Sequence, residues 1–387
     1  MIIKGMLSRP NYTETIARAL KRSPITALLG PRQCGKTTLA RMLMEQQNAH
    51  YFDLEAPSDQ QRLKNPELLF NSLSGTVILD EVQLAPELFN ILRVVVDQPN
   101  HQNRYLILGS ASPHIIKKVS ETLAGRVEFI ELAGFDLTEI AVQDQTVLWL
   151  RGGFPRSFLA ASDTDSLAWR EGFIRTFLER DIPQLGITIP ATAMRRFWTM
   201  LAHQHGQTWN ASELGRSMSL TDKTVRRYLD ILTGTYMVRQ LQPWHENLKK
   251  RQVKAPKIYL RDSGLLHSLL SIPDQNSLLG HPNLGASWEG FALEQVLNII
   301  GISDVYFWAT HSGAELDLLC FSKGKRFGIE FKFNEAPKIS KSMRCALQDL
   351  NLAHLWIVHP GNHSYPADEK ITVLSIKDAL SLHEKLS

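Results

Sequence analysis

The sequence predicts an α/β protein that begins with a parallel β-sheet flanked by helices and ends with a second α/β domain. Three observations predict this fold class. Apolar segments alternate with helical patterns in the first third of the chain, as is typical of a parallel sheet. The length of 387 residues exceeds one ordinary core. The late segment RFGIEFKF has the period of two that a strand requires. We expect four domains, at residues 1–140, 141–190, 191–272 and 273–387.

Composition limits the classes of protein to which the chain can belong. No apolar run reaches the ~18 residues of a membrane-spanning helix. The first residues lack the apolar stretch and cleavage site of a signal peptide. The three cysteines are scattered and form neither a disulfide framework nor a zinc spacing. We therefore expect a cytoplasmic protein that has no membrane partner.

Positive charge is concentrated in one part of the chain. The net charge is +4, yet residues 191–270 hold 13 Lys and Arg residues against 5 Asp and Glu residues. The remainder of the chain is mildly acidic. One basic module of this kind predicts a local surface for a polyanion.

A strand, a glycine loop and a helix follow one another in ITALLGPRQCGKTTLARML, residues 25–43. The loop has the complete P-loop (Walker A) pattern, whose glycines let backbone N–H groups face phosphate oxygens. The start of the helix adds its positive end. Lys36 would reach the β- and γ-phosphates, and Thr37 would bind Mg²⁺. The predicted cofactors are ATP and Mg²⁺, and the predicted binding residues are Gly30, Pro31, Arg32, Gln33, Cys34, Gly35, Lys36, Thr37 and Thr38.

The second nucleotide motif is GTVILDEVQ, residues 75–83, an apolar strand that ends in Asp80 and Glu81. In P-loop ATPases, an acid at this strand end (Walker B) holds the Mg²⁺ water shell, and the next Glu polarises the attacking water. Asp80 and Glu81 fit these roles. Without the P-loop, the same pair would be an ordinary strand end.

Several further segments carry a family resemblance. LLGPRQCGKTTLA, YFDLEAPSD, VILDEVQLAPELFNILRVVVD, LGSAS and LAGRVEFIELAGFDLTEI occur in this order. The series resembles a large prokaryotic family of AAA-type ATPases that carry a C-terminal domain of uncharacterised function. The resemblance covers nearly the whole chain. It implies an AAA-type core at residues 1–140 and a helical lid or linker at 141–190.

Three residues have two open interpretations each. Ser110 ends the strand YLILGS, where AAA-type ATPases place a sensor of the γ-phosphate, but serine also suits a helix N-cap. Arg126 is a candidate arginine finger that acts on a neighbouring subunit, which would imply a homo-oligomer, or else a surface arginine. Pro155, in LRGGFPRSFL, resembles a lid residue near the base or ribose, or else marks a turn.

Residues 208–244 have the character of a helix-turn-helix. ASELGRSM is a short helix, and DKTVRRYLDILT is a second helix with Thr221 as its N-cap. Val225, Leu229 and Leu232 share one face of the second helix, which leaves its basic residues exposed. TYMVRQLQPW and APKIYLRD would form a hairpin with a basic tip that includes Lys254.

This module is predicted to be a winged helix at residues 191–272 that contacts DNA phosphates, with DNA favoured over RNA. The alternative is a winged helix that serves only as a subunit or lid contact. The turn at Asp262–Gly264 is predicted to end a strand and cap the next helix. The predicted DNA-binding residues are Lys223, Arg226, Arg227, Lys249, Lys250 and Arg251.

The C-terminal segment places charged residues on successive elements. Glu289 lies on an amphipathic helix at 281–301, Asp317 on a strand, and Glu330 and Lys332 on the next strand. This order is similar to the restriction-endonuclease-like superfamily, with its PD-(D/E)xK pattern. The resemblance implies that Glu289, Asp317 and Glu330 hold Mg²⁺ and that Lys332 orients or deprotonates a water molecule. Alternatively, Glu330 and Lys332 form a surface ion pair worth ~0–1 kcal/mol. His311 would reach this site or lie in solvent.

The sequence therefore predicts an ATPase that is coupled to DNA binding, with a C-terminal Mg²⁺-dependent nuclease-like domain. A second possibility is a nucleotide-controlled DNA-binding switch that has no nuclease activity. A third is a chaperone-like ATPase that acts on protein partners.

Overall fold

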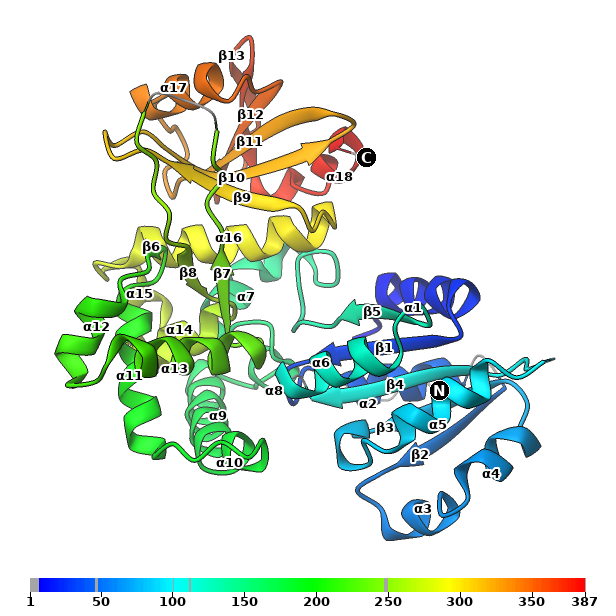
Figure 1. The fold of residues 1–387 in the computed structure, drawn as a ribbon. Coiled ribbons are helices and arrows are strands. Elements are labelled where there is room, and N and C mark those ends of the chain that lie inside the picture. The colour runs from blue at the N-terminus through cyan, green and yellow to red at the C-terminus, as the bar shows by residue number, and fades with distance from the viewer. Residues whose placement is uncertain (1–6, 46–47, 100, 111–112, 247–249, 387) are drawn as a thin grey trace. The chain divides into compact units, whose positions relative to one another are not determined.

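The structure, a computed structural model, describes residues 7–45, 48–99, 101–110, 113–246 and 250–386 (Figure 1). The chain forms two units. The first contains Met1–Gly134 and Gly234–Tyr236, and the second contains Phe135–Thr233 and Met237–Ser387. The predicted lid, basic module and C-terminal domain thus lie almost entirely in the second unit. No helix within the described ranges is long and apolar enough to span a membrane.

Five parallel strands form the sheet of the first unit, in the order β2-β3-β4-β1-β5. Parallel neighbours need crossover connections, and helices occupy them here (Figure 1). The predicted parallel sheet flanked by helices is confirmed. The strands are β1 (Ile25–Gly30), β2 (Ala49–Asp53), β3 (Thr76–Asp80), β4 (Arg104–Ser110) and β5 (Val127–Glu131). The helices are α1 (Pro10–Arg22), α2 (Lys36–Met44), α3 (Pro57–Arg62), α4 (Pro66–Ser72), α5 (Leu88–Val96) and α6 (Pro113–Thr122).

The central strands of this sheet are buried on both faces. Every residue of β1 is buried, and so are the last four residues of β3. This burial explains why ITALLG and TVILD are continuous apolar runs without alternation. Because all five strands are parallel, their carboxyl ends meet at one edge of the sheet, where the P-loop and Asp80 follow.

The second unit begins with a group of helices and continues into a small antiparallel sheet. The helices are α7 (Gln145–Arg151), α8 (Pro155–Phe158), α9 (Asp163–Thr176), α10 (Ile182–Gln184), α11 (Ala191–His203), α12 (Ala211–Met218), α13 (Asp222–Gly234), α14 (Ser263–Leu269) and α15 (Gln275–Leu279). The sheet has the order β6-β8-β7. Its strands are β6 (Gln207–Thr208), β7 (Val238–Leu241) and β8 (Lys257–Leu260).

The local predictions for the basic module match α12, α13 and the two hairpin strands. Val225, Leu229 and Leu232 on α13 are fully buried. The hydroxyl of Thr221 accepts a hydrogen bond from the Thr224 N–H at 3.2 Å, so the predicted N-cap is present. Asp262 likewise caps α14, because its carboxylate accepts the Leu265 N–H at 2.8 Å.

The C-terminal part of the second unit contains a six-stranded mixed sheet in the order β13-β14-β12-β11-β10-β9. The strands are β9 (Val305–Ala309), β10 (Glu315–Ser322), β11 (Lys325–Phe331), β12 (His354–His359), β13 (Tyr365–Asp368) and β14 (Ile371–Ser375). The helices are α16 (Leu284–Ile300), α17 (Lys341–Asp349) and α18 (Ser381–Leu386). The prediction that α16 is amphipathic was wrong: twelve of its seventeen residues are buried, because it contacts α14 as well as β11 and α18.

The connection from β7 to β8 was predicted to be the basic tip of a hairpin, but in the structure it is hydrogen-bonded to the C-terminal sheet. Its backbone runs along β9, an edge strand of the six-stranded sheet. The Trp244 N–H donates to the Phe307 carbonyl at 2.7 Å, and the Val253 N–H donates to the Ala309 carbonyl at 3.0 Å. An edge strand offers unpaired N–H and C=O groups, and the connection satisfies some of them. Lys249, predicted at the tip, lies outside the described residues.

Candidate functional site

The P-loop connects β1 to α2 and requires glycine at two positions. Gly35 has a φ of 101°, a conformation that residues with a side chain rarely adopt. A Cβ atom at Gly30 would lie 2.2 Å from the Leu132 carbonyl oxygen. Gln33 also takes a left-handed conformation, with a φ of 64°. The loop therefore turns tightly beneath the first N–H groups of α2, which have no partners within the helix.

Lys36 lies over this loop rather than in solvent. The side chain is buried, and its ammonium donates to the carbonyls of Gly30 at 3.1 Å and Pro31 at 2.8 Å. The positive charge thus lies beside the backbone amides that the sequence assigns to phosphate binding. The other predicted loop residues, Arg32, Cys34 and Thr38, lie on the same loop and the first turn of α2.

Asp80 joins the P-loop helix to the end of β3. Its carboxylate accepts a hydrogen bond from the Thr37 hydroxyl at 2.7 Å, and a second from the Tyr51 hydroxyl at 2.7 Å. The Glu81 N–H donates to the other carboxylate oxygen at 2.9 Å. The structure therefore brings together Thr37 and Asp80, the two residues predicted to share Mg²⁺. Tyr51 was missed because nothing in the strand AHYFD distinguishes it from a packing tyrosine.

Glu81 takes a strained backbone conformation directly after the end of β3. Its φ is 54° and its ψ is 42°, in the left-handed region. Burial raises the pKa of the Glu81 carboxyl, and the amide of Gln83, which donates to the carboxylate, partly opposes this rise. Gln83 was not predicted, although it lies in the DEVQ segment that carries the family resemblance.

Arg9 ties the P-loop to the end of the first unit. Its guanidinium donates to the carbonyl of Cys34 at 3.2 Å, and to the carbonyls of Ala133 at 3.2 Å and Gly134 at 2.9 Å. These contacts join a loop residue to the chain beyond β5. Sequence analysis missed Arg9, because it precedes the first helix and belongs to no motif.

Three further residues were predicted to belong to the nucleotide site: Ser110, Arg126 and Pro155. Ser110 is the last residue of β4 and pairs in register with Gly30, but its side chain is outside the described part. Arg126 binds Asp97 of the same chain through two hydrogen bonds, at 2.8 and 2.6 Å, so the surface interpretation accounts for it in this structure. Pro155 is the first residue of α8, and its proposed role near a nucleotide remains a prediction.

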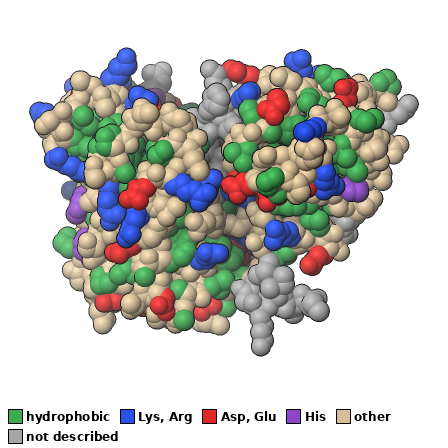
Figure 2. All heavy atoms as spheres, turned by 90° about the horizontal axis from the view of Figure 1, so that it is seen from below, with side chains coloured by type: hydrophobic (Ala, Val, Ile, Leu, Met, Phe, Trp, Pro, Cys, Tyr) green, Lys and Arg blue, Asp and Glu red, His purple; other side chains and the backbone are tan. Residues whose placement is uncertain are grey.

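The basic residues predicted for DNA fall into two groups. Lys223, Arg226 and Arg227 are exposed on α13, and Arg226 pairs with Asp230 at 3.1 Å. Lys250 is not free, because its ammonium binds the Asp349 carboxylate at 2.6 Å. On the face that Figure 2 presents, Lys and Arg side chains are interspersed with Asp and Glu side chains. That face is therefore not a single positive surface.

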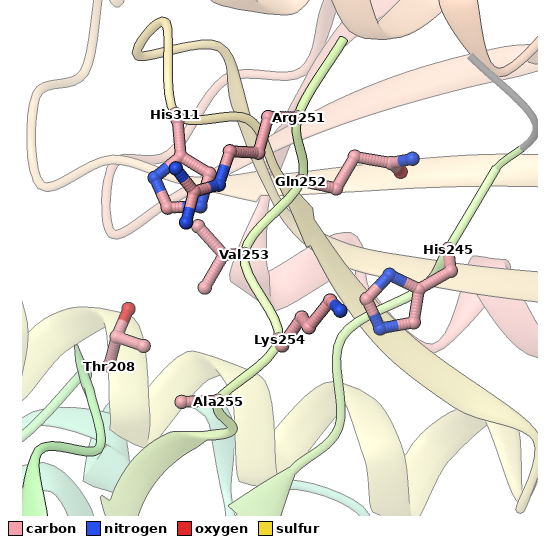
Figure 3. A pocket seen from close by; sticks show the side chains of 8 residues that line it. All are labelled: Thr208, His245, Arg251, Gln252, Val253, Lys254, Ala255 and His311. Carbon is pink, nitrogen blue, oxygen red and sulfur yellow. The ribbon is translucent and has the colours of Figure 1, made fainter. Parts of the chain in front are cut away.

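A separate cationic pocket forms where the β7–β8 connection meets the C-terminal sheet (Figure 3). Its volume is about 620 Å³. Its four basic side chains are exposed, and no salt bridge involves any of them within the described ranges. His311 belongs to this pocket rather than to the predicted acidic site. The lining residues are Thr208, His245, Arg251, Gln252, Val253, Lys254, Ala255 and His311.

The four residues of the nuclease-like pattern converge in the C-terminal part. Strands β10 and β11 are antiparallel with Leu318 opposite Ile329, so Asp317 and Glu330 lie next to each other. The Lys332 ammonium lies 2.8 Å from the Glu330 carboxylate and 4.0 Å from that of Asp317. Lys332 follows the last residue of β11.

A lysine from the small sheet also enters this acid cluster. The ammonium of Lys257, on β8, lies 3.2 Å from the carboxylates of both Glu289 and Asp317, and it also pairs with Glu315. The Tyr259 hydroxyl donates to Glu289 at 2.6 Å. Sequence analysis noted this segment, APKIYLRD, but assigned it no chemistry. A lysine within an otherwise apolar strand was the available signal.

Burial and mutual repulsion set the protonation of the cluster. They raise the pKa of Glu289 and of Glu330, and Asp317 is the acid that contributes most after burial. Burial opposes the charge on Lys257, but the neighbouring Tyr259 and the carboxylates raise its pKa well above the ordinary value. Within the described segments, no three His, Cys, Asp or Glu side chains are arranged to hold a metal ion. The acids assigned to Mg²⁺ by resemblance instead have the Lys257 ammonium among them, 3.2 Å from Glu289 and from Asp317.

Comparison with known proteins assigns the parts of the chain to families. Residues 22–141 match the AAA domain family, and residues 142–276 and 284–379 match two families described as domains of unknown function, DUF8612 and DUF4143. The chain is 49% identical over 386 residues to Uncharacterized protein Rv2008c of Mycobacterium tuberculosis, a match over 97% of this chain and 88% of the relative. Uncharacterized protein Mb2031c of Mycobacterium bovis matches equally.

One solved structure shares the fold over most of its length. The Walker-type ATPase PABY2304 of Pyrococcus abyssi has a TM-score of 0.51 and 14% sequence identity, covering 68% of this chain and 96% of that chain. At this identity, the likeness concerns the fold alone. Together with the AAA domain match, it supports an AAA-type P-loop ATPase fold.

Proposed function

The chain belongs to the same family as the two mycobacterial proteins and contains an AAA domain, and we propose that it binds and hydrolyses ATP with Mg²⁺. One observation carries this proposal: the Thr37 hydroxyl and the Asp80 carboxylate meet at 2.7 Å beside the P-loop. A hydroxyl and a carboxylate are oxygen ligands of the kind that Mg²⁺ prefers.

Each residue has a chemical role in this proposal. The P-loop amides and the Lys36 ammonium bind the phosphates of ATP, and Thr37 and Asp80 hold Mg²⁺. Glu81 accepts a proton from the water that attacks the γ-phosphate. The pKa of its carboxyl is raised by burial, and a base whose pKa lies closer to neutrality accepts a proton more readily.

Phosphate release and nucleotide binding test the proposal. We expect Glu81→Gln to retain ATP binding and to lose hydrolysis, because the amide cannot accept the proton. Lys36→Ala should weaken ATP binding itself. Glu87→Gln is the matched control, since Glu87 is an exposed acid a few residues beyond. Hydrolysis at the parental rate in Glu81→Gln would rule out the role of Glu81.

We further propose that the second unit binds nucleic acid, DNA in preference to RNA, and that this binding is coupled to the ATPase. Two features support the proposal: exposed Lys223 and Arg227 on α13, and the cationic pocket with Arg251 and Lys254 (Figure 3). A winged-helix interpretation of α11–α13 with β6–β8 agrees with this use. Contacts of this type are made to phosphates and therefore weaken as salt increases.

Fluorescence anisotropy with labelled duplex DNA and RNA, at several salt concentrations, measures this binding. The double variant Lys223→Glu/Arg227→Glu should weaken binding to all sequences and flatten the salt dependence. Lys370→Glu, at another exposed lysine, should leave both unchanged. ATP hydrolysis measured with and without DNA then tests the coupling. Equal DNA affinity in the double variant and the parent would remove α13 from the proposed interface.

A second candidate function is metal-dependent cleavage of nucleic acid by the C-terminal part. The convergence of Asp317, Glu330 and Lys332 supports it, and the ammonium of Lys257 among the same acids opposes it. An assay on single- and double-stranded DNA and RNA, with Mg²⁺ or Mn²⁺ and with or without ATP, tests it. Cleavage that persists in Asp317→Ala would come from a contaminant and not from this cluster. Absence of cleavage favours the DNA-binding switch.

A further inference from the structure

The acid cluster of the C-terminal part contains more acidic than basic side chains. Its four carboxylates come from α16, β10 and β11, and its two ammonium groups come from β8 and from the end of β11. Lys332 belongs to the same sheet as Asp317 and Glu330. Lys257 comes instead from β8 of the small three-stranded sheet, about sixty residues earlier in the chain. The source of the second cation is therefore the unusual feature of this cluster.

The position of the Lys257 ammonium determines whether a metal ion can bind between the carboxylates of Glu289 and Asp317. Its ammonium lies at equal distances of 3.2 Å from one carboxylate oxygen of Glu289 and one of Asp317. A divalent ion bound by these same two oxygens would contact each of them at about 2.0–2.6 Å. That position lies between the two carboxylates, where the ammonium already is. The two cations cannot be present together, because they would overlap and repel each other.

We infer that Lys257 is the resident cation of this acid cluster and that it excludes a divalent metal ion from the site. The inference concerns the regulation of the second candidate function, nucleic-acid cleavage, and it is independent of ATP hydrolysis. The cluster is closed to metal as long as β8 keeps its place. In that state, the acids join the small sheet to the C-terminal sheet through an ammonium.

The backbone around Lys257 holds the ammonium in place. Lys257 pairs with Thr208 on β6 and with Leu241 on β7, so its strand is hydrogen-bonded on both sides. Its side chain is only 5% exposed, and the ammonium lies 5.8 Å from the centre of the Phe307 ring. Tyr259 projects from the same face of β8 and binds Glu289. Metal entry therefore requires this ammonium to leave a buried position on a strand that is paired on both sides.

Replacement of Lys257 by methionine tests the exclusion directly. Methionine approximates the length of the lysine side chain and carries no charge, so Lys257→Met removes the ammonium that lies between Glu289 and Asp317 and keeps that of Lys332. We expect this variant to bind one Mn²⁺ ion that the parent does not bind. The added substitution Asp317→Asn should abolish this binding. Lys370→Met, which changes an exposed lysine outside the cluster, is the matched control and should bind no more Mn²⁺ than the parent.

Electron paramagnetic resonance of free Mn²⁺ gives the readout, with EDTA-treated and nucleotide-free full-length protein. Every protein carries Thr37→Ala and Asp80→Asn, so that both proposed metal ligands of the P-loop site are replaced. Uptake of Mn²⁺ by the parent that depends on Asp317 would overturn the inference. A folded Lys257→Met protein that takes up no Mn²⁺ would overturn it as well. Neither result bears on ATP hydrolysis, which is measured separately through Glu81→Gln.

A chemical measurement on unaltered Lys257 remains decisive even where Lys257→Met fails to fold. An amine-reactive acetylating reagent, followed by peptide mass spectrometry, compares Lys257 with Lys254. We expect Lys257 to react at least tenfold more slowly than Lys254, with and without millimolar Mn²⁺. Equal reaction of the two lysines would show that the ammonium is not held among the acids. A large rise in Lys257 reactivity with Mn²⁺ would show that the parent admits the metal.

Discussion

At the scale of single residues, Gln83 provides the sharpest test of what sets the pKa of Glu81, the proposed base. Its amide donates to the Glu81 carboxylate, and a hydrogen bond to a charged acceptor stabilises the ionised form. Burial raises the pKa of Glu81 and this hydrogen bond lowers it. Gln83 does not touch the nucleotide in the proposed mechanism, so we regard it as a positioning residue.

We expect Gln83→Leu to lower kcat about tenfold, which corresponds to about 1.4 kcal/mol in the barrier. Without the amide, the pKa of Glu81 rises further, so a higher pH is needed to ionise the base. The acid limb of the pH profile of kcat should therefore move to higher pH. Gln61→Leu, at an exposed glutamine, is the control. A lower kcat with an unmoved acid limb would contradict a role for Gln83 through Glu81.

Whether sequence analysis predicted a functional residue depends on how near in the sequence its partners lie, or on a known pattern. Thr37 and Lys36 lie within one short motif whose spacing alone specifies the chemistry. Asp317 and Glu330 were found because the order of their strands resembles that of the restriction-endonuclease-like superfamily. Lys257 was not found, because its partners lie on α16 and β10, and only the tertiary fold brings them within 3.2 Å. A lysine within an apolar strand is an unusual feature, but it does not identify the partners of the lysine.

At the scale of elements, the β7–β8 connection departs most from the prediction. Its sequence suggested a basic hairpin tip, and hydrophobic periodicity gives no sign of docking in so short a segment. The aromatic ring of Trp244 explains the docking. Its centre lies 4.8 Å from that of Phe321 and 5.1 Å from that of Tyr306, and the Arg326 guanidinium lies over it at 5.7 Å.

Trp244→Ala should therefore release the connection from β9. Removal of a partly buried aromatic side chain costs about 1–3 kcal/mol. Deuterium exchange followed by mass spectrometry should show faster exchange in peptides that cover residues 242–246 and 305–309. Trp169→Ala, on α9, removes an equally large side chain elsewhere and should leave these peptides protected. Unchanged exchange in Trp244→Ala would mean that the backbone pairing alone holds the connection.

At the scale of the whole molecule, long-range ion pairs explain how the parts of the second unit are joined. Glu294 on α16 is almost completely buried and binds Arg239 at 2.9 Å and Arg261 at 3.2 Å. Arg239 belongs to β7, and Arg261 follows β8. The small sheet is thus joined to the long helix of the C-terminal part twice, through Glu294 and through the cluster around Lys257.

These two connections respond to pH in opposite directions. Burial would raise the pKa of Glu294, but Arg239 and Arg261 outweigh burial and lower it to about 2. Its contribution to the free energy of unfolding is therefore complete above the unfolded pKa of about 4.3 and is lost as the pH falls towards 2. Glu289 and Glu330 have raised pKa values. Their ionisation therefore costs stability as the pH rises above the ordinary glutamate range.

Glu294→Gln should consequently be destabilising near neutral pH and nearly neutral in strong acid. The lowering of the Glu294 pKa from about 4.3 to about 2 corresponds to about 3 kcal/mol at pH 7, and the loss should shrink between pH 4.5 and pH 2. Urea denaturation of the full chain at pH 7, 5 and 3.5, followed by tryptophan fluorescence, measures it. Glu384→Gln, at an exposed acid, should cost nothing at any pH. A loss in Glu294→Gln that stays constant with pH would show that the glutamate contributes by packing and not through its charge.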